Sequence, residues 1–529
     1  MENASAIKAS AASTKQADML RLGIAGLFLA GIALYVVLYA EQLGVAGSAF
    51  VVIAAVIGGY MAINIGANDV ANNVGPSVGS GAISLGGAIA IAFIFEASGA
   101  IIAGSEVVGT IRSGIINPDL IPDPNTFMWL MMGALLAAAL WINLATVVGA
   151  PVSTTHSIVG GVLGGGIAAG GLAIANWDVI GRIVASWVIS PVMGGLIAAT
   201  FLYIIKRTIT YKKDMSTAAA QWVPVLIAAM GFAAATYMMM KGMGRLMKVE
   251  MWQAYVIGAI AFILVYLLVK PILHRRREKI ENSKEGVNAL FTIPLVFAIA
   301  LLSFAHGSND VANAIGPLAA IIALVSTGGA EIATAAAVPL WVLVIGGLSL
   351  SVGLWLFGPK IIRVVGSQIT ELDRSRAYCI AMAATITVII ASQFGIPVST
   401  THITVGAVVG VGLLREFLKV SYERKIADIR AHHHDQSEEA VNDFIERFER
   451  AGIQERGLML QMLKLQSKDD KSRLLSKKER KGLGAVYRKE IVKRDLIYKI
   501  VASWVITVPA AALLSAMLFF TIRGMLLQV

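Results

Sequence analysis

Residues 66–75 read GANDVANNVG, and residues 307–316 read GSNDVANAIG. Two further strings occur twice and in the same order: PVSTTH at 151–156 and 397–402, and IVASWVI at 183–189 and 500–506. Such self-similarity at long range indicates a chain built from repeated structural units. We therefore interpret the protein as two copies of one unit, joined by the segment between them.

The sequence around these strings is strongly apolar. The 529 residues are 57% hydrophobic and only 15% charged, whereas soluble domains are about 25% charged. Apolar stretches of roughly 20 residues, enough to cross a bilayer as a helix, recur at 21–41, 46–64, 82–104, 126–149, 157–175, 181–205, 221–240, 252–273, 288–305, 332–357, 377–396, 402–418 and 499–523. The composition predicts an all-α polytopic membrane protein with about 12–13 transmembrane segments.

The net charge of +11 lies mainly in the hydrophilic loops, where the positive-inside rule explains it without nucleic-acid binding. The basic loops 206–214 and 274–285 are separated by two predicted helices, so both lie on one side, the cytoplasm. Segment 421–498 has 18 Lys and Arg against 14 Asp and Glu, whereas the corresponding linker 171–179 has neither Lys nor Arg. Repeats of inverted topology place this basic segment inside, and they are the simpler interpretation.

This interpretation puts the N-terminus and segment 421–498 in the cytoplasm and the C-terminus outside, in a bacterial inner membrane. The chain then divides into an N-terminal extension with an additional membrane helix (1–45), a first transport repeat (46–214), linking helices with a basic loop (215–287), the first part of a second repeat (288–420), a charged helical insert (421–498) and the last helix of the second repeat (499–529).

The NDVAN strings place acids at membrane depth. An Asp at the centre of a membrane helix costs about 2.5–3.5 kcal/mol on insertion scales, so Asp69 and Asp310 are candidates for function. Carboxylate and amide oxygens suit Na⁺ or the acceptance of a proton, and flanking Asn residues four positions apart share one helix face. We predict cation sites at the pairs Asn68/Asp69 and Asn309/Asp310, with Asn72 and Asn313 as further ligands.

A Gly-Pro pair follows each NDVAN string, at 75–76 and 316–317. Proline removes a helical hydrogen bond, so we expect each pair to break its helix and expose backbone carbonyls. Broken helices at corresponding places in two halves mark the binding sites of many transporters.

The PVSTTH strings have the opposite character. Proline favours the first turn of a helix, so we expect a helix N-terminus at each string. Its hydroxyls then stand beside free N–H groups and the positive end of the helix dipole, which together favour an anion. The hydroxyls belong to Ser153, Thr154 and Thr155 in the first copy and to Ser399, Thr400 and Thr401 in the second. The two kinds of string describe a cation-coupled oxyanion carrier with its site near the midplane.

Other polar residues of these segments have alternative interpretations. Ser and Thr also pack between membrane helices, although duplication at the same spacing favours a site. His156 and His402 are candidates for proton relays or for structural and capping roles. Glu96, in the string FIFEASGA, is an intramembrane acid with no evident partner in the second half, and we regard it as a candidate cation ligand.

The paired GANDVAN/GSNDVAN and PVSTTH strings resemble those of the inorganic phosphate transporter (PiT) family, over roughly 46–214 and 288–523. The resemblance implies phosphate uptake coupled to Na⁺ or H⁺, inverted repeats, re-entrant hairpins that carry the Ser-Thr strings, and a homodimer. It assigns phosphate and cation binding to Asn68, Asp69, Ser153, Thr154, Thr155, Asn309, Asp310, Ser399, Thr400 and Thr401. The form of the signature is similar to the sodium-coupled branch, although Ala381 stands where relatives of that branch often carry an acid.

The leading hypothesis is a symporter of inorganic phosphate coupled to Na⁺, or alternatively to H⁺, that works by alternating access and needs no cofactor. Sulfate or another tetrahedral oxyanion is a near alternative. An intramembrane hydrolase using Ser153 and His156 is a remote one, because no third orienting residue is evident. A channel is a third class. No G-x-x-x-x-G-K-[ST] loop occurs, which argues against direct drive by ATP.

Overall fold

The computed structural model describes residues 2–43, 45, 49–105, 107–121, 123–150, 152–242, 249–327, 337–368, 372–432 and 494–526, together with 443, 446–447 and 459. The described chain is helical and contains no β-strand. Its principal helices are α1 (Glu2–Leu38), α2 (Ala49–Asn68), α3 (Val70–Gly79), α4 (Leu85–Ala103), α5 (Pro124–Val148), α6 (Thr154–Gly170), α7 (Trp177–Ile205), α8 (Met215–Tyr237), α9 (Met251–Arg276), α10 (Lys284–Leu290), α11 (Thr292–Ser326), α12 (Leu340–Gln368), α13 (Arg374–Gln393), α14 (Thr400–His432) and α18 (Arg494–Leu526).

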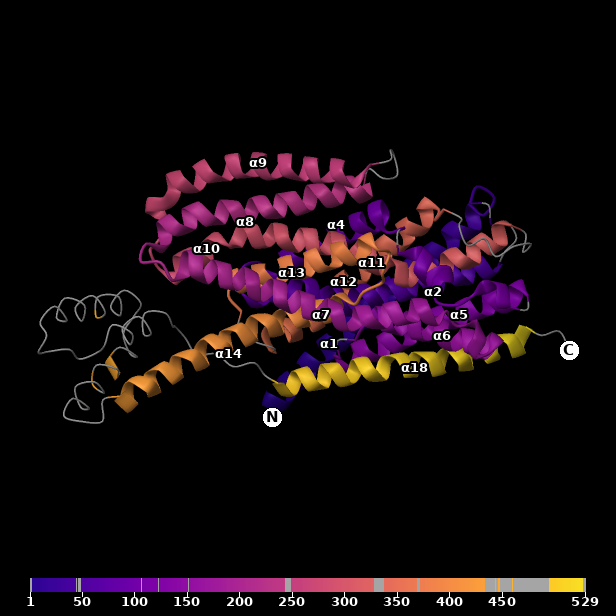
Figure 1. Cartoon of the computed structure of the whole chain (residues 1–529). Coiled ribbons are helices and arrows are strands. Elements are labelled where there is room, and N and C mark those ends of the chain that lie inside the picture. The colour runs from indigo at the N-terminus through magenta and orange to yellow at the C-terminus, as the bar shows by residue number, and fades with distance from the viewer. Residues whose placement is uncertain are drawn as a thin grey trace, which may run out of the picture.

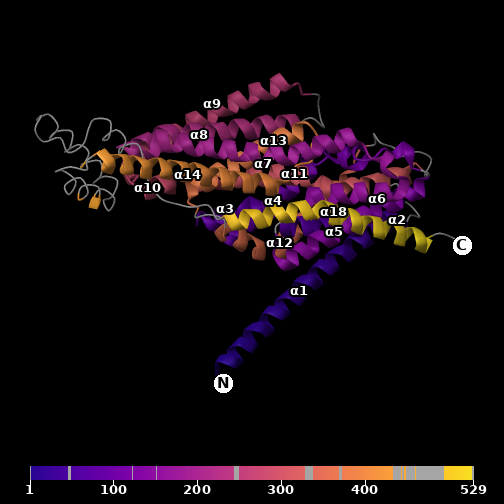
Figure 2. The ribbon, with the colours of Figure 1, turned by 60° about the horizontal axis from the view of Figure 1, so that its bottom comes forward.

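The helices form one elongated bundle, with most axes running along its length (Figure 1). Twelve helices of the described chain are long and apolar enough to cross a membrane, which confirms the prediction of a polytopic helical protein. The apolar stretch 157–175 is the exception, because it forms α6, which is only 17 residues long. Helix α1 extends away from the other helices toward the N-terminus (Figure 2). Residues 433–493 of the predicted insert lie outside the described residues, apart from the isolated positions given above.

The prediction that the Gly-Pro pairs break their helices is wrong. Pro76 lies inside α3 and Pro317 inside α11, which continues for 35 residues through the motif and beyond it. Membrane helices tolerate proline where neighbouring helices surround the kink, and the membrane-spanning window of α11 is 94% buried. In the first half the helix is interrupted earlier, at Asp69, which separates α2 from α3.

The two halves are interlocked rather than side by side. Helix α7 of the first half packs against α14 of the second, and α18 of the second half packs against α6 of the first. In the same way α2 packs against α12, and α4 against α11. Each half therefore completes its packing with helices of the other half, and α11 lies at the centre of the bundle.

Glycine makes these crossings close. A Cβ atom on Gly66 of α2 would lie 1.9 Å from the carbonyl oxygen of Leu350, and one on Gly353 of α12 would lie 1.9 Å from that of Ile63. The crossings of α7 with α14 and of α6 with α18 contain similar glycine-to-backbone contacts. Small residues give membrane helices this proximity, because lipid supplies no hydrophobic force between them.

We predict that Gly353→Val separates α2 from α12 and lowers the melting temperature of the detergent-solubilised protein. Overpacking of this kind typically costs about 1–3 kcal/mol, and here the obstacle is backbone that cannot rotate away. The matched control is Gly26→Val in α1, where an added Cβ meets no atom within 4 Å. Equal melting temperatures for the two variants would show that the α2–α12 crossing accommodates a larger side chain without loss of stability.

Candidate functional site

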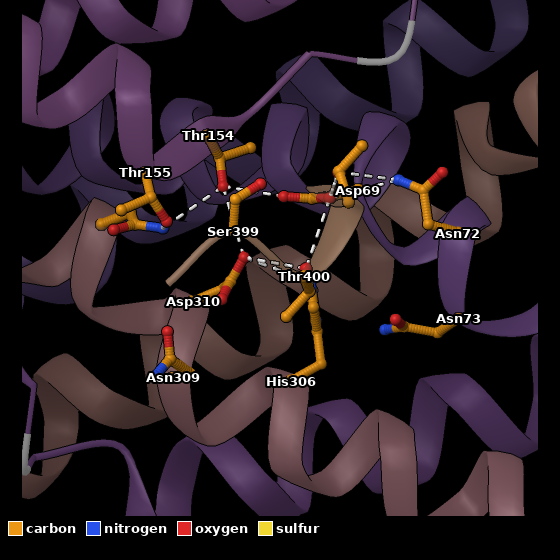
Figure 3. Close-up of polar contacts among 12 residues, drawn as sticks. Asp69, Asn72, Asn73, Thr154, Thr155, His306, Asn309, Asp310, Ser399 and Thr400 are labelled. Carbon is orange, nitrogen blue, oxygen red and sulfur yellow. Dashed lines mark hydrogen bonds and ion pairs between the residues drawn. The ribbon is translucent and has the colours of Figure 1, made fainter. Parts of the chain in front are cut away.

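The four duplicated polar strings converge at the centre of the bundle (Figure 3). Two of them are the NDVAN strings, which lie at the α2–α3 junction and in the middle of α11. The other two are the PVSTTH strings, which lie at the N-termini of α6 and α14. Every predicted site residue is buried, and Asp69, Asp310, Thr154 and Thr400 have no solvent-accessible surface. The structure thus brings together residues that lie more than 300 positions apart in the chain.

Serine, rather than proline, stands at the start of α6 and of α14, the two helices that begin at the PVSTTH strings and that we call the half-helices. Ser153 is the N-cap of α6, and its Oγ accepts a hydrogen bond of 3.1 Å from the backbone N–H of His156. Ser399 stands directly before α14, and its Oγ accepts one of 3.3 Å from the N–H of His402. The expectation of a proline in the first turn is wrong for the second copy, because Pro397 lies before the helix, and Pro151 lies outside the described residues. The caps leave the threonine hydroxyls available to the site.

These threonines join the two aspartates. The Thr154 hydroxyl lies 2.9 Å from Asp69 Oδ2 and 3.3 Å from Asp310 Oδ2, within donating distance of both. Thr400 is placed alike, 3.4 Å from Asp69 Oδ1 and 3.5 Å from Asp310 Oδ2. Figure 3 shows both side chains pointing into the space between the carboxylates. Thr401 also donates to Asp69, whereas Thr155 donates to the carbonyl oxygen of Val398, 3.0 Å away.

Asn68 and Asn309 hold the chain that leads into each half-helix. The Asn68 side chain donates to Thr146 Oγ1 (2.9 Å) and the Ala150 carbonyl (3.1 Å), and accepts from the N–H of Val152 (3.2 Å). Asn309 does the same in the second half. It donates to Ser392 Oγ (2.9 Å) and the Ile396 carbonyl (3.5 Å), and accepts from the N–H of Val398 (3.4 Å). Both amides therefore position the half-helices, a task that their proximity to the acids did not predict.

Asn72 and Asn313 leave oxygen atoms without donors. The Asn72 amide donates to Asp69 Oδ1 (3.2 Å) and Thr401 Oγ1 (2.9 Å), and that of Asn313 donates to Thr154 and Thr155, both at 3.2 Å. Within the described chain the Oδ1 atoms of Asn72 and Asn313 accept no hydrogen bond, and neither does Asp310 Oδ1. Buried polar atoms are normally satisfied, so these oxygens are candidate cation ligands.

The prolines add backbone oxygens to this set. Pro76 and Pro317 stand four residues after Asn72 and Asn313, and a proline has no N–H to donate to the carbonyl four positions earlier. Each asparagine thus has a carbonyl without its α-helical donor as well as an unsatisfied side-chain oxygen. The prolines therefore free one backbone carbonyl in each motif, as predicted, although the helices do not break there.

Glu96 is linked to the site by a histidine that sequence reasoning missed. The Glu96 carboxylate lies 2.7 Å from His306 Nδ1 and accepts a hydrogen bond of 3.0 Å from the Asn73 amide. The other His306 nitrogen, Nε2, lies 3.3 Å from Asp310 Oδ2. All these side chains are buried. The signal was present, because His306 precedes Asp310 by one helical turn, but its first-half counterpart is Ile65 and a search for duplicated residues passes over it.

Ligand atoms of Asp69, His306 and Asp310 all lie within 4.8 Å of one another, close enough to share one metal ion. Carboxylate and amide oxygens are hard ligands, which suit Na⁺ better than a soft metal. The carboxylate and amide oxygens of the site therefore suit a small hard cation, and the threonine hydroxyls beside them are donors of the kind that an anion needs.

The two remaining motif histidines form part of a ring stack behind the half-helices. The ring of His156 lies 3.7 Å from that of Trp187, the ring of His402 lies 3.5 Å from that of Trp504, and the two histidines are 4.4 Å apart, centroid to centroid. Both tryptophans come from the IVASWVI strings. The backbone of Trp504 interacts with the His156 ring and that of Trp187 with the His402 ring, and neither histidine is hydrogen-bonded to Ser153 through a ring nitrogen. Ser153 therefore receives no ring nitrogen as a base, as a serine hydrolase would require.

The fold and the site define a polytopic membrane transporter with a buried polar centre. Residues 65–515 match the model of the phosphate transporter family, and the chain belongs to that family. It is 50% identical over 509 residues to a Helicobacter pylori protein named "putative phosphate permease", covering 95% of each chain. A Pyrococcus furiosus protein of the same description is 40% identical over 378 residues, 71% of this chain and 90% of that one.

The fold is also similar to a solved structure described as the sodium-dependent phosphate transporter. The TM-score is 0.71 at 30% sequence identity, and the match covers 90% of this chain and all of that chain. The family and the all-helical polytopic fold are therefore confirmed, whereas the inverted topology of the repeats stays a prediction.

We predict that the histidine stack has a packing role. His156→Phe keeps a ring between Trp187 and His402 and should preserve the melting temperature and phosphate uptake into proteoliposomes. His156→Ala removes the buried ring, a change that costs about 3–5 kcal/mol for an aromatic residue, and should lower both. If His156→Phe abolished uptake at an unchanged melting temperature, the ring nitrogens would be needed and the relay interpretation would replace this one.

Proposed function

We propose that this chain is a symporter that carries inorganic phosphate across the membrane together with Na⁺. The observation that carries the proposal is the meeting of two capped helix N-termini, which favour an anion, with two buried aspartates, which favour a cation. Membership of the phosphate transporter family supports phosphate as the substrate. The similarity to a structure described as a sodium-dependent phosphate transporter supports Na⁺ as the coupling ion.

The anion binds at the hydroxyl ends of α6 and α14. Ser153, Thr154 and Thr155 stand at the N-terminus of α6, and Ser399, Thr400 and Thr401 stand at that of α14. The positive ends of the two helix dipoles favour an anion there. The hydroxyls that bridge Asp69 and Asp310 rotate to donate to phosphate oxygens instead. A phosphate that keeps a proton also donates to an aspartate, whereas sulfate has no proton to donate at neutral pH, so the acid pair favours phosphate.

The cations bind at the oxygens without donors. Two carboxylates in a medium of low dielectric repel each other, and an added phosphate strengthens the repulsion. Na⁺ bound by Asp69 with Asn72, and by Asp310 with Asn313, offsets this charge. Glu96 reaches the second aspartate through His306, so this acid contributes through the imidazole. The alternative coupling ion, H⁺, would use the same acids as proton carriers.

The interlocked halves supply a means of alternating access. Helices α5, α6 and α18 form one packed group, and α7, α13 and α14 form another. Each group contributes one half-helix to the site, so a rocking motion of one group against the other opens the site to either side without dismantling it. Repeats of inverted topology would make the two openings equivalent, as in other carriers.

We expect Asp69→Asn and Asp310→Asn each to abolish Na⁺-driven uptake of radiolabelled phosphate into proteoliposomes. The amide keeps the shape of the side chain but removes the charge that holds the cation. Asp178→Asn, a change at an exposed residue in the first turn of α7, is the matched control and should transport normally. Size-exclusion profiles establish that all three variants are folded. Wild-type rates in both site variants would exclude the acid pair from coupling.

The coupling ion and the substrate are separated by imposing a Na⁺ gradient and a pH gradient in turn, with excess sulfate as competitor. We expect uptake with the Na⁺ gradient alone and no inhibition by sulfate. Uptake driven only by the pH gradient would assign proton carriage to the acids, and strong inhibition by sulfate would make the chain a general oxyanion carrier. A response that rises linearly with phosphate concentration, without saturation, would indicate a channel.

A further inference from the structure

A cavity of about 310 Å³ lies far from the central site, at the end of the bundle that carries the basic loops 206–214 and 274–285. It is enclosed by the end of α7 and the turn that follows (Lys206–Thr210), by α10 and by the start of α13. The label of α10 marks this end in Figure 1. Helix α13 runs 20 residues from the cavity to the central site, a length of about 30 Å.

More basic than acidic side chains line the cavity. Lys206, Lys284 and Arg376 line it, together with Asp373 and Glu285. The carboxylate of Asp373 is already engaged as the N-cap of α13, where it accepts from the N–H of Arg376 (2.9 Å) and pairs with its Nε (3.3 Å). Glu285 is exposed to solvent. Three basic side chains thus line the cavity, against two acidic ones.

Lys206 shares its nearby counter-charge with Arg376. It is partly buried, and the acid that attracts its ammonium group is Asp373, whose carboxylate is already paired with Arg376. Arg376 and Arg415 lie close enough to repel its ammonium group, and Arg415 is itself only 4% exposed. Gathering cations in a partly desolvated place is unfavourable unless an anion joins them.

We propose that this cavity binds an anionic phosphate group, as a site separate from the transport site. Lysine and arginine are the side chains that proteins use for phosphate, and the hydroxyls of Thr210 and Tyr211 line the same space as further donors. The volume lies at the lower end of the range for small-molecule sites. The proposal goes beyond transport and does not depend on the role of the central aspartates.

Two sources can supply such a group. Inorganic phosphate is one, and it would report the phosphate concentration on this side of the membrane. The headgroup of an anionic lipid is the other, because Lys206 lies near the end of a candidate membrane span (Trp177–Thr210), where basic pockets meet lipid headgroups. The chemistry of the two is shared, so the experiment has an arm for each.

The test uses the full chain purified in a neutral detergent. Binding of ³²P-labelled inorganic phosphate and of dihexanoyl-phosphatidylglycerol is measured for the wild type, Lys206→Gln, Lys206→Arg and Arg207→Gln, with zwitterionic dihexanoyl-phosphatidylcholine as the lipid control. Arg207 is the adjacent residue in sequence, but it is exposed and does not line the cavity. Phosphate bound at the transport site contributes equally to all four proteins.

We expect Lys206→Gln to lower the affinity for one of the two anionic ligands by about tenfold or more. This is the effect of losing one charge-assisted hydrogen bond. Lys206→Arg and Arg207→Gln should bind both ligands like the wild type. The binding of phosphatidylcholine should be the same for all the variants. A selective loss of inorganic phosphate identifies the free ion as the source, and a selective loss of phosphatidylglycerol identifies the lipid. Equal binding of both ligands by Lys206→Gln and Arg207→Gln overturns the proposal.

Discussion

The structure depends on holding the buried carboxylates of Asp69 and Asp310 together. Charged groups in a medium of low dielectric are costly unless they receive hydrogen bonds or counter-ions. Here the donors are threonine hydroxyls from two different half-helices, and Thr154 lies within hydrogen-bond distance of both acids. The acids thus need α6 and α14 in place, and the half-helices need Asn68 and Asn309 to fix the segments that precede them.

This constraint explains why the halves are interlocked. If each half packed only with itself, the acid of one half would have donors from that half alone. Instead α7 lies against α14 and α18 against α6, and the glycines at these crossings let backbones meet closely. The threonines of both strings then face the same pair of acids. Close packing of the backbones therefore brings the threonine hydroxyls of both half-helices within hydrogen-bond distance of the two aspartates.

The sequence predicted the membrane class, the family and the convergence of the strings, because duplication marks residues that two halves use in the same way. It failed where the two halves differ or where tertiary packing overrides a local preference. Pro317 leaves α11 unbroken because neighbouring helices surround it, and His306 was missed because its counterpart is Ile65. The cavity around Lys206 has no sequence motif, since its cations come from separate helices that only the fold brings together.

The difference between the halves bears on the charge of the site. The first half contributes Asp69 and Glu96, whereas the second contributes Asp310 and has Ala381 where an acid was expected. His306 stands between Glu96 and Asp310, so an imidazole of the second half occupies the gap between acids of both halves. The second half therefore reaches the acid of the first half through His306, rather than through an acid of its own at position 381.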